Sequence, residues 1–140
     1  MRNVAAYKWL YHRPVEDLER EAKILAATVE RATVLGLNRD WVTEVVVAQM
    51  TAAKHIQSRW FTEWARTIGP TEAPDLAIDL RPKISALTDV LIQHLLIIKK
   101  APLSAQDRNE LMETPAELAN DSAAWQIAIG PLLKQNSGFP

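Results

Sequence analysis

Apolar residues recur along the chain at intervals of three and four, the spacing that places them on one face of an α-helix. Within residues 15–35 one series of apolar residues steps by four and three, through Leu18, Ala22, Leu25, Val29 and Ala32. Gly36 follows this run, where the C-terminus of a helix favours a residue in the left-handed conformation. The pattern predicts a long amphipathic helix that ends near Leu35.

Two more long helices follow from the same spacing. One begins at an Asn38 cap and runs to about Arg66, with its stripe at Val42, Val46, Gln49, Ala53, Ile56, Trp60 and Trp64. After a loop over 68–76, Asp79 can cap a helix whose first turn tolerates Pro82. The stripe of that helix is Ile84, Leu87, Leu91, Leu95 and Ile98.

Prolines mark the remaining boundaries. Ala101-Pro102 ends the third long helix, and Pro115 opens a last one that extends through Trp125 to about 130–131. Residues 135–140 are expected to be a loose tail. Residues 4–11 predict the end of a helix that Pro14 stops, cut short at the start of the chain.

No alternating pattern of the β type and no internal repeat competes with these helices. The length of 140 residues suits one compact unit. The sequence therefore predicts an all-α fold, a bundle of long helices forming one domain over 1–140 with a truncated N-terminal helix.

The composition excludes several classes of function. The net charge is −1 and the basic residues are scattered, so neither a nucleic-acid surface nor a polybasic membrane surface is indicated. Cysteine is absent, which removes disulfides, zinc-thiolate sites and thiol catalysis. The three histidines lie far apart, so no metal site is expected, and no glycine-rich phosphate loop occurs. No apolar run reaches transmembrane length, and no signal-peptide segment opens the chain.

Polar residues inside or beside the apolar stripes are the first sign of a site. On the first long helix a second face lies roughly 100° from the apolar seam and carries Asp17, Arg20, Glu21, Ile24, Thr28 and Arg31. The simpler interpretation is a solvated face with ion pairs between turns. Gln49 and Gln57 fall within the next stripe, where an unpaired amide costs about 1–3 kcal/mol. Bonding to another helix is their simpler explanation.

Three cations also fall near the predicted core, namely Lys8, Arg20 and Arg81. Arg81 lies in the first turn of its helix, where the helix dipole disfavours a positive charge. Snorkelling at the end of the bundle would explain Arg81 and Lys8 without any site. Several cations inside a bundle are costly, however, unless an anionic ligand completes them. We therefore expect a pocket for a small dianion, in which any chemistry relies on positioning and electrostatics.

Four segments resemble those of a known family. Residues 4–9, VAAYKW, and 13–21, RPVEDLERE, closely resemble the all-α (AroQ-type) chorismate mutases, in which a helix-borne lysine precedes an arginine by twelve residues. Residues 52–57, AAKHIQ, are similar to a later motif of the family that ends in Gln or Glu. Pro74-Asp75-Leu76 with Arg81 is similar to the exported (gamma) subclass. The resemblance covers roughly residues 4–100, and it is the combination of motifs that makes it specific.

The resemblance implies an enzyme that rearranges chorismate, a dicarboxylate, to prephenate within one helical chain, with neither cofactor nor metal. Lys8 and Gln57 would donate hydrogen bonds to the ether oxygen of the substrate, while Arg20 and Arg81 would grip its carboxylates. Glu21, with the backbone near Asp17, would receive the ring hydroxyl. Because Gln57 is an amide, activity should not require acidic pH.

The resemblance has two departures and leaves alternatives. The family has another carboxylate-binding arginine eleven residues before the lysine, and the sequence has no counterpart. Ala53 stands where relatives often carry Ser or Thr. The resemblance further implies a homodimer and a periplasmic or secreted location. The alternatives are a catalytically impaired mutase-like protein that binds a small dianion or a partner, and a domain of a longer polypeptide.

Overall fold

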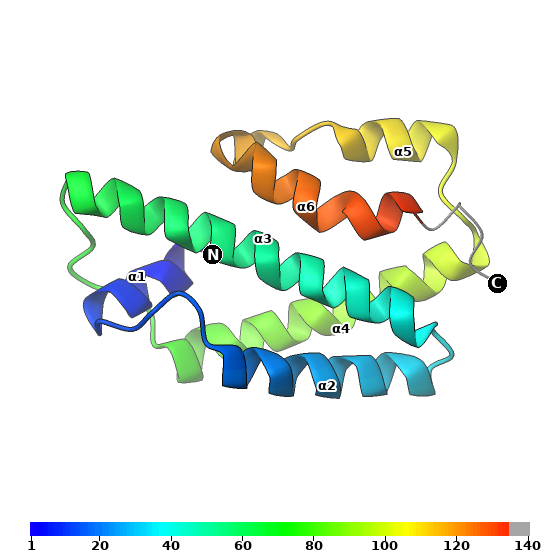
Figure 1. Cartoon of the computed structure of the whole chain (residues 1–140), viewed down its shortest axis with the longest axis horizontal. Helices are drawn as coiled ribbons and strands as arrows, with labels where there is room; N and C mark the ends of the chain where they lie inside the picture. The colour runs from blue at the N-terminus through cyan, green and yellow to red at the C-terminus, as the bar shows by residue number, and fades with distance from the viewer. Residues whose placement is uncertain (135–140) are drawn as a thin grey trace.

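The computed structural model describes residues 1–134, and the expected tail over 135–140 lies outside that range. Within residues 1–134, six α-helices carry the fold: α1 (Arg2–Leu10), α2 (Leu18–Val34), α3 (Arg39–Arg66), α4 (Arg81–Lys100), α5 (Ala105–Met112) and α6 (Ser122–Leu133). A π-helical turn, η1 (Leu76–Leu80), precedes α4, and a 3-10 turn, η2 (Ala116–Asp121), precedes α6. The predicted all-α class is confirmed (Figure 1).

Local capping explains where the first long helices begin and end. The Asp17 side chain accepts a hydrogen bond from the backbone N–H of Arg20, and the Asn38 side chain accepts one from Trp41. Gly36 has a φ of 98° and closes α2 in the left-handed conformation, as its sequence position predicted. The two helices that bear most of the candidate site are therefore fixed by their own sequence.

The start of α4 differs from the prediction. Asp75, not Asp79, is the capping residue, and its carboxylate accepts from the backbone N–H of Ile78 at 2.7 Å. In turn, the carboxylate of Asp79 accepts a hydrogen bond from the backbone N–H of Asp75 at 2.9 Å. This reciprocal pair adds one π-helical turn ahead of α4, and Pro82 sits in the first turn of α4 as expected.

The last third of the chain also departs from the prediction. Helix α5 was not predicted, because it buries no residue and so shows no apolar stripe; a Ser104–Asp107 capping box opens it. Pro115 precedes the 3-10 turn and not an α-helix. Pro131 lies inside α6 and does not end it.

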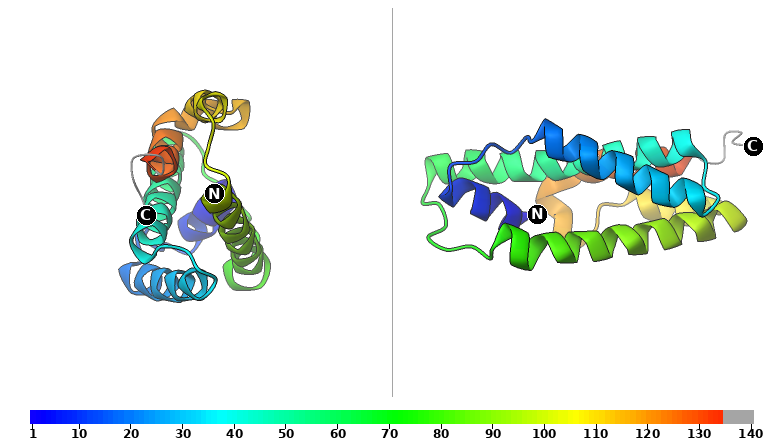
Figure 2. Two further views of the ribbon diagram at one scale, coloured as in Figure 1. Left: turned by 90° about the vertical axis from the view of Figure 1, so that its right-hand side faces the viewer. Right: turned by 90° about the horizontal axis from the view of Figure 1, so that it is seen from below.

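Helices α2 and α6 each lie along α3, and α4 runs at a greater distance from α2 and α3 (Figures 1 and 2). The main apolar cluster joins α2, α3 and α4 at one end of the bundle, through Val29, Ala32, Leu37, Trp41, Val42, Val45, Val46, Ile92 and Leu95. Two smaller clusters fasten α1 at the other end, one on η1 and one on α3. Between these clusters α4 stands apart from α2 and α3, which leaves room for a site.

Two leucines of the predicted stripes are not in the core. Leu87 is 67% exposed, because the inward face of α4 is centred on Ile92 and Leu95 and Leu87 falls at its edge. Leu18 is 66% exposed at the first turn of α2, beyond the main cluster. Over residues 1–134 no helix combines the length and the apolar character that crossing a membrane requires.

Candidate active site

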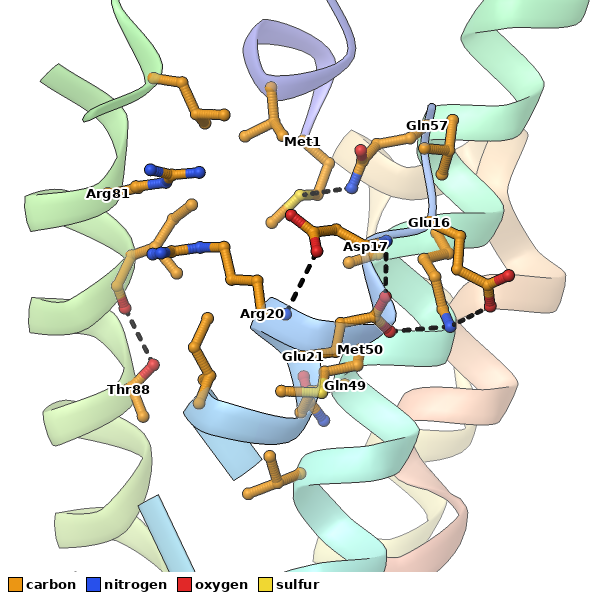
Figure 3. Close-up of a pocket in the computed structure, with 18 of the residues that line it drawn as sticks. Met1, Glu16, Asp17, Arg20, Glu21, Gln49, Met50, Gln57, Arg81 and Thr88 are labelled. Atoms are coloured by element: carbon orange, nitrogen blue, oxygen red, sulfur yellow. Dashed lines mark hydrogen bonds and ion pairs between the residues drawn. The ribbon is translucent and has the colours of Figure 1, made fainter. Parts of the chain in front are cut away.

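A cavity of about 1120 Å³ lies between α2, α3 and α4, with α1 at one end (Figure 3). All six residues singled out from the sequence line it: Lys8, Asp17, Arg20, Glu21, Gln57 and Arg81. Ile24, Thr28 and Arg31 line it too, so the second face of α2 is a cavity wall. Interpreting that face as merely solvated was therefore wrong.

The lining of the cavity is predominantly positive. Six of its side chains are cationic and three are anionic: Lys8, Arg13, Arg20, Arg31, Lys54 and Arg81 against Glu16, Asp17 and Glu21. Arg20 and Arg81 point toward the same space in Figure 3, and within residues 1–134 neither forms an ion pair with a carboxylate. Burial lowers the pKa of Arg20, and the charge of Arg81 lowers it further. Two guanidinium groups without a carboxylate in contact form a site suited to an anion.

Lys8 enters the cavity from α1. The neighbouring turn of that helix buries Val4, Ala5 and Ala6, which fixes the direction of the Lys8 side chain. Its ammonium donates a 2.6 Å hydrogen bond to the carbonyl oxygen of Val15. Burial lowers the pKa of Lys8, against an opposing effect of the nearby carboxylates. Lys8 is thus a half-buried cation aimed at the cavity.

Gln57 differs from Gln49 in how its amide is satisfied. The Gln49 Nε2 donates a hydrogen bond to the carbonyl of Ala128 on α6 at 3.1 Å. Bonding to another helix, the simpler interpretation, therefore holds for Gln49. Gln57 is 4% exposed, its Nε2 meets only the sulfur of Met1 at 3.6 Å, and its buried Oε1 has no partner within residues 1–134. A buried amide without strong partners is costly, which favours a ligand contact for Gln57.

Glu21 and Asp17 lie at the start of α2 and are tied to one another. The Glu21 Oε2 accepts from the backbone N–H of Asp17 at 3.0 Å, while its Oε1 lies 2.8 Å from the ammonium of Lys54. Lys54 also pairs with Glu16 at 3.1 Å. Lys54 was not among the residues singled out from the sequence; the signal was its place about one turn before Gln57, on the face of α3 that meets α2.

These groups can bind and polarise, but they form no nucleophile–base pair. The described part of the chain also holds no cluster of three or more His, Asp or Glu side chains that could bind a metal ion. Two arginines without ion-pair partners, a lysine and a buried amide suit a dianionic ligand, and their donors can stabilise negative charge on it.

Comparison with known proteins finds chorismate mutases. The chain is 34% identical to the secreted chorismate mutase of Yersinia pestis over 95 residues, 68% of this chain and 51% of that protein. It is 34% identical to the secreted chorismate mutase of Mycobacterium tuberculosis over 94 residues, 66% and 47% of the two chains. The crystal structure of chorismate mutase from Burkholderia thailandensis matches with a TM-score of 0.78 and 29% identity, over 94% of this chain and 88% of that one.

No family model matches the chain, which spans about half the length of the curated relatives it matches. The secreted relatives confirm the resemblance to the exported subclass. Helical architecture and sequence identity agree, and the chain is a homologue of the all-α (AroQ-type) chorismate mutases.

Proposed function

We propose that this chain is a chorismate mutase, an isomerase that converts chorismate to prephenate in the cavity between α2, α3 and α4. The observation that carries the proposal is the convergence of Arg20 and Arg81, both without carboxylate partners, with Lys8 and Gln57 on one cavity. The apolar clusters join every long helix to a neighbour, so we treat the chain as one mutase domain.

In this mechanism the protein holds the substrate and takes no covalent part. A carbon–oxygen ether bond breaks while a carbon–carbon bond forms within the same molecule, and no proton is transferred to the protein. Arg20 and Arg81 bind the two carboxylates and hold the substrate folded in its reactive shape. Glu21 accepts the ring hydroxyl, next to the backbone of Asp17.

Catalysis then comes from stabilising charge. The ether oxygen becomes more negative as its bond to carbon breaks, and Lys8 and Gln57 donate hydrogen bonds to it. Such donors bind the transition state more tightly than the substrate, which raises kcat. The Gln57 Nε2 is suited to this role, because its present contact with the Met1 sulfur is weak and readily replaced.

The direct test is the loss of chorismate absorbance with the purified chain, with prephenate identified as the product. Conversion above the spontaneous rate supports the proposal. Binding of chorismate without conversion would favour the alternative, an impaired mutase-like protein that holds a small dianion. A parallel version extended upstream, with an arginine eleven residues before Lys8, measures how much an arginine at that position contributes.

Exchanging Gln57 for glutamate should make the activity depend on pH. A carboxylate cannot donate a hydrogen bond to the ether oxygen, whereas a protonated acid can. We expect Gln57→Glu to lower kcat/KM more than about 10-fold at neutral pH and to recover as the pH falls toward about 5. The parent should show little dependence over that range. Equal profiles for the two proteins would remove Gln57 from its proposed role.

We also propose that the chain forms a homodimer. Leu87, Val90 and Ile97 on α4 are 67%, 49% and 60% exposed. They lie within roughly 80° of one another around the helix, at 100° per residue. An apolar face of this kind suits a second copy of the chain. Light scattering should give a dimer mass for the parent, and Leu87→Glu with Ile97→Glu should shift the mass toward a monomer. An unchanged mass would place any interface elsewhere.

A further inference from the structure

Lys54 is held at the wall of the cavity by two carboxylates from the start of α2. Its ammonium lies 2.8 Å from Glu21 and 3.1 Å from Glu16. The side chains of Lys54 and Glu21 are 27% and 22% exposed, whereas those of the Lys23–Glu19 pair on the outer surface are 76% and 84% exposed. Exposed pairs contribute little to stability, so the partial burial of the Lys54 pair sets it apart.

The segment 15–17 links three members of the candidate site. The carbonyl of Val15 accepts from Lys8, the carboxylate of Glu16 pairs with Lys54, and the N–H of Asp17 donates to Glu21. Helix α3 reaches this segment through the ammonium of Lys54. The orientation of Glu21 therefore depends on a contact with α3 as well as on its own helix.

We propose that Lys54 is a positioning residue of this site: held between Glu16 and Glu21, it fixes the Glu21 carboxylate in the direction that receives the substrate hydroxyl. This inference rests on the proposed function. The two carboxylates occupy the ammonium, so Lys54 acts through Glu21 without touching the substrate. It also offsets negative charge in a cavity that must admit a dianion. The same two hydrogen bonds raise the pKa of Lys54, so it stays cationic near neutral pH.

The test is a double-mutant cycle on kcat/KM at a temperature well below the unfolding midpoints. Lys54→Met should lower kcat/KM about 10-fold, mostly through a higher KM. Lys54→Arg, which keeps the charge, should stay within about 3-fold of the parent. In a Glu21→Gln background the same Lys54→Met change should cost less than about 2-fold, because the group that Lys54 orients is already altered.

Lys23→Met is the matched control, since it removes the same kind of ion pair from an outer surface that does not line the cavity; it should leave kcat/KM unchanged. If Lys54→Met lowers only the unfolding midpoint and leaves kcat/KM intact, Lys54 is a structural anchor and the positioning role is overturned. Persistence of the full 10-fold loss in the Glu21→Gln background overturns it as well. A parent chain that neither binds nor converts chorismate would refute the proposed function itself, and this inference with it.

Discussion

Arg20→Ala should lower kcat/KM about 100- to 1000-fold, the loss expected when a charged contact to a bound carboxylate is removed. The Asp17 cap fixes the backbone of Arg20 at the first turn of α2. Its guanidinium has no carboxylate partner within residues 1–134 and lies near the charge of Arg81. That geometry leaves its donors free for a ligand.

Stability should respond differently from activity. Removing Arg20 relieves the burial of its charge and its repulsion with Arg81, which together outweigh an attraction to Asp17, so the unfolding midpoint of Arg20→Ala should not fall. Arg39→Ala is the control, since Arg39 forms an exposed pair with Glu30 away from the cavity and should leave kcat/KM within about 2-fold. A measured loss of only a few-fold for Arg20→Ala would mean that substrate carboxylates bind elsewhere.

The first two long helices could be predicted because their signals are local. The Asn38 cap and the left-handed Gly36 need only neighbouring residues, and both appear in the structure. The Asp17 cap is equally local, but it was not predicted. Helix α5 has no comparable local signal of an apolar stripe, because it buries no residue and its composition is polar. The start of α4 failed for a related reason, because Asp75 and Asp79 are equally good caps in sequence and only their reciprocal bonding decides between them.

The site illustrates a second limit. Periodicity correctly put Arg20, Glu21 and Thr28 on one face of α2, but it could not tell a solvated face from a cavity wall. That distinction depends on how far α4 stands from α2, which the separation of the apolar clusters sets. The partners of Lys54 are equally non-local, since Glu16 lies 38 residues away in sequence. The sequence was thus enough to predict which side chains share a face of one helix, but not which contacts form between helices.

Lys8→Met should be the most severe substitution for turnover, with kcat falling about 1000-fold, because it removes the cationic donor to the ether oxygen. The methionine keeps most of the apolar stem.

Burial lowers the pKa of Lys8, so the folded protein disfavours its charged form. This unfavourable contribution to folding is present at neutral pH and fades as the pH rises through the lowered pKa toward the ordinary value near 10.5. Loss of the hydrogen bond to the Val15 carbonyl opposes the gain from removing this charge, so the unfolding midpoint of Lys8→Met at neutral pH should stay close to that of the parent.

The same lowered pKa predicts how the parent responds to alkaline pH. Catalysis needs the ammonium, so kcat/KM should fall as the pH rises through the pKa of Lys8 in the free protein, below its ordinary value. A bound dianion favours the charged form, so the fall in kcat should come at a higher pH than the fall in kcat/KM. Lys83→Met, an exposed change on α4, should alter neither profile. Coincident alkaline limbs for kcat and kcat/KM would show that the substrate charge is not felt at Lys8, and would remove the ammonium from the transition-state contact.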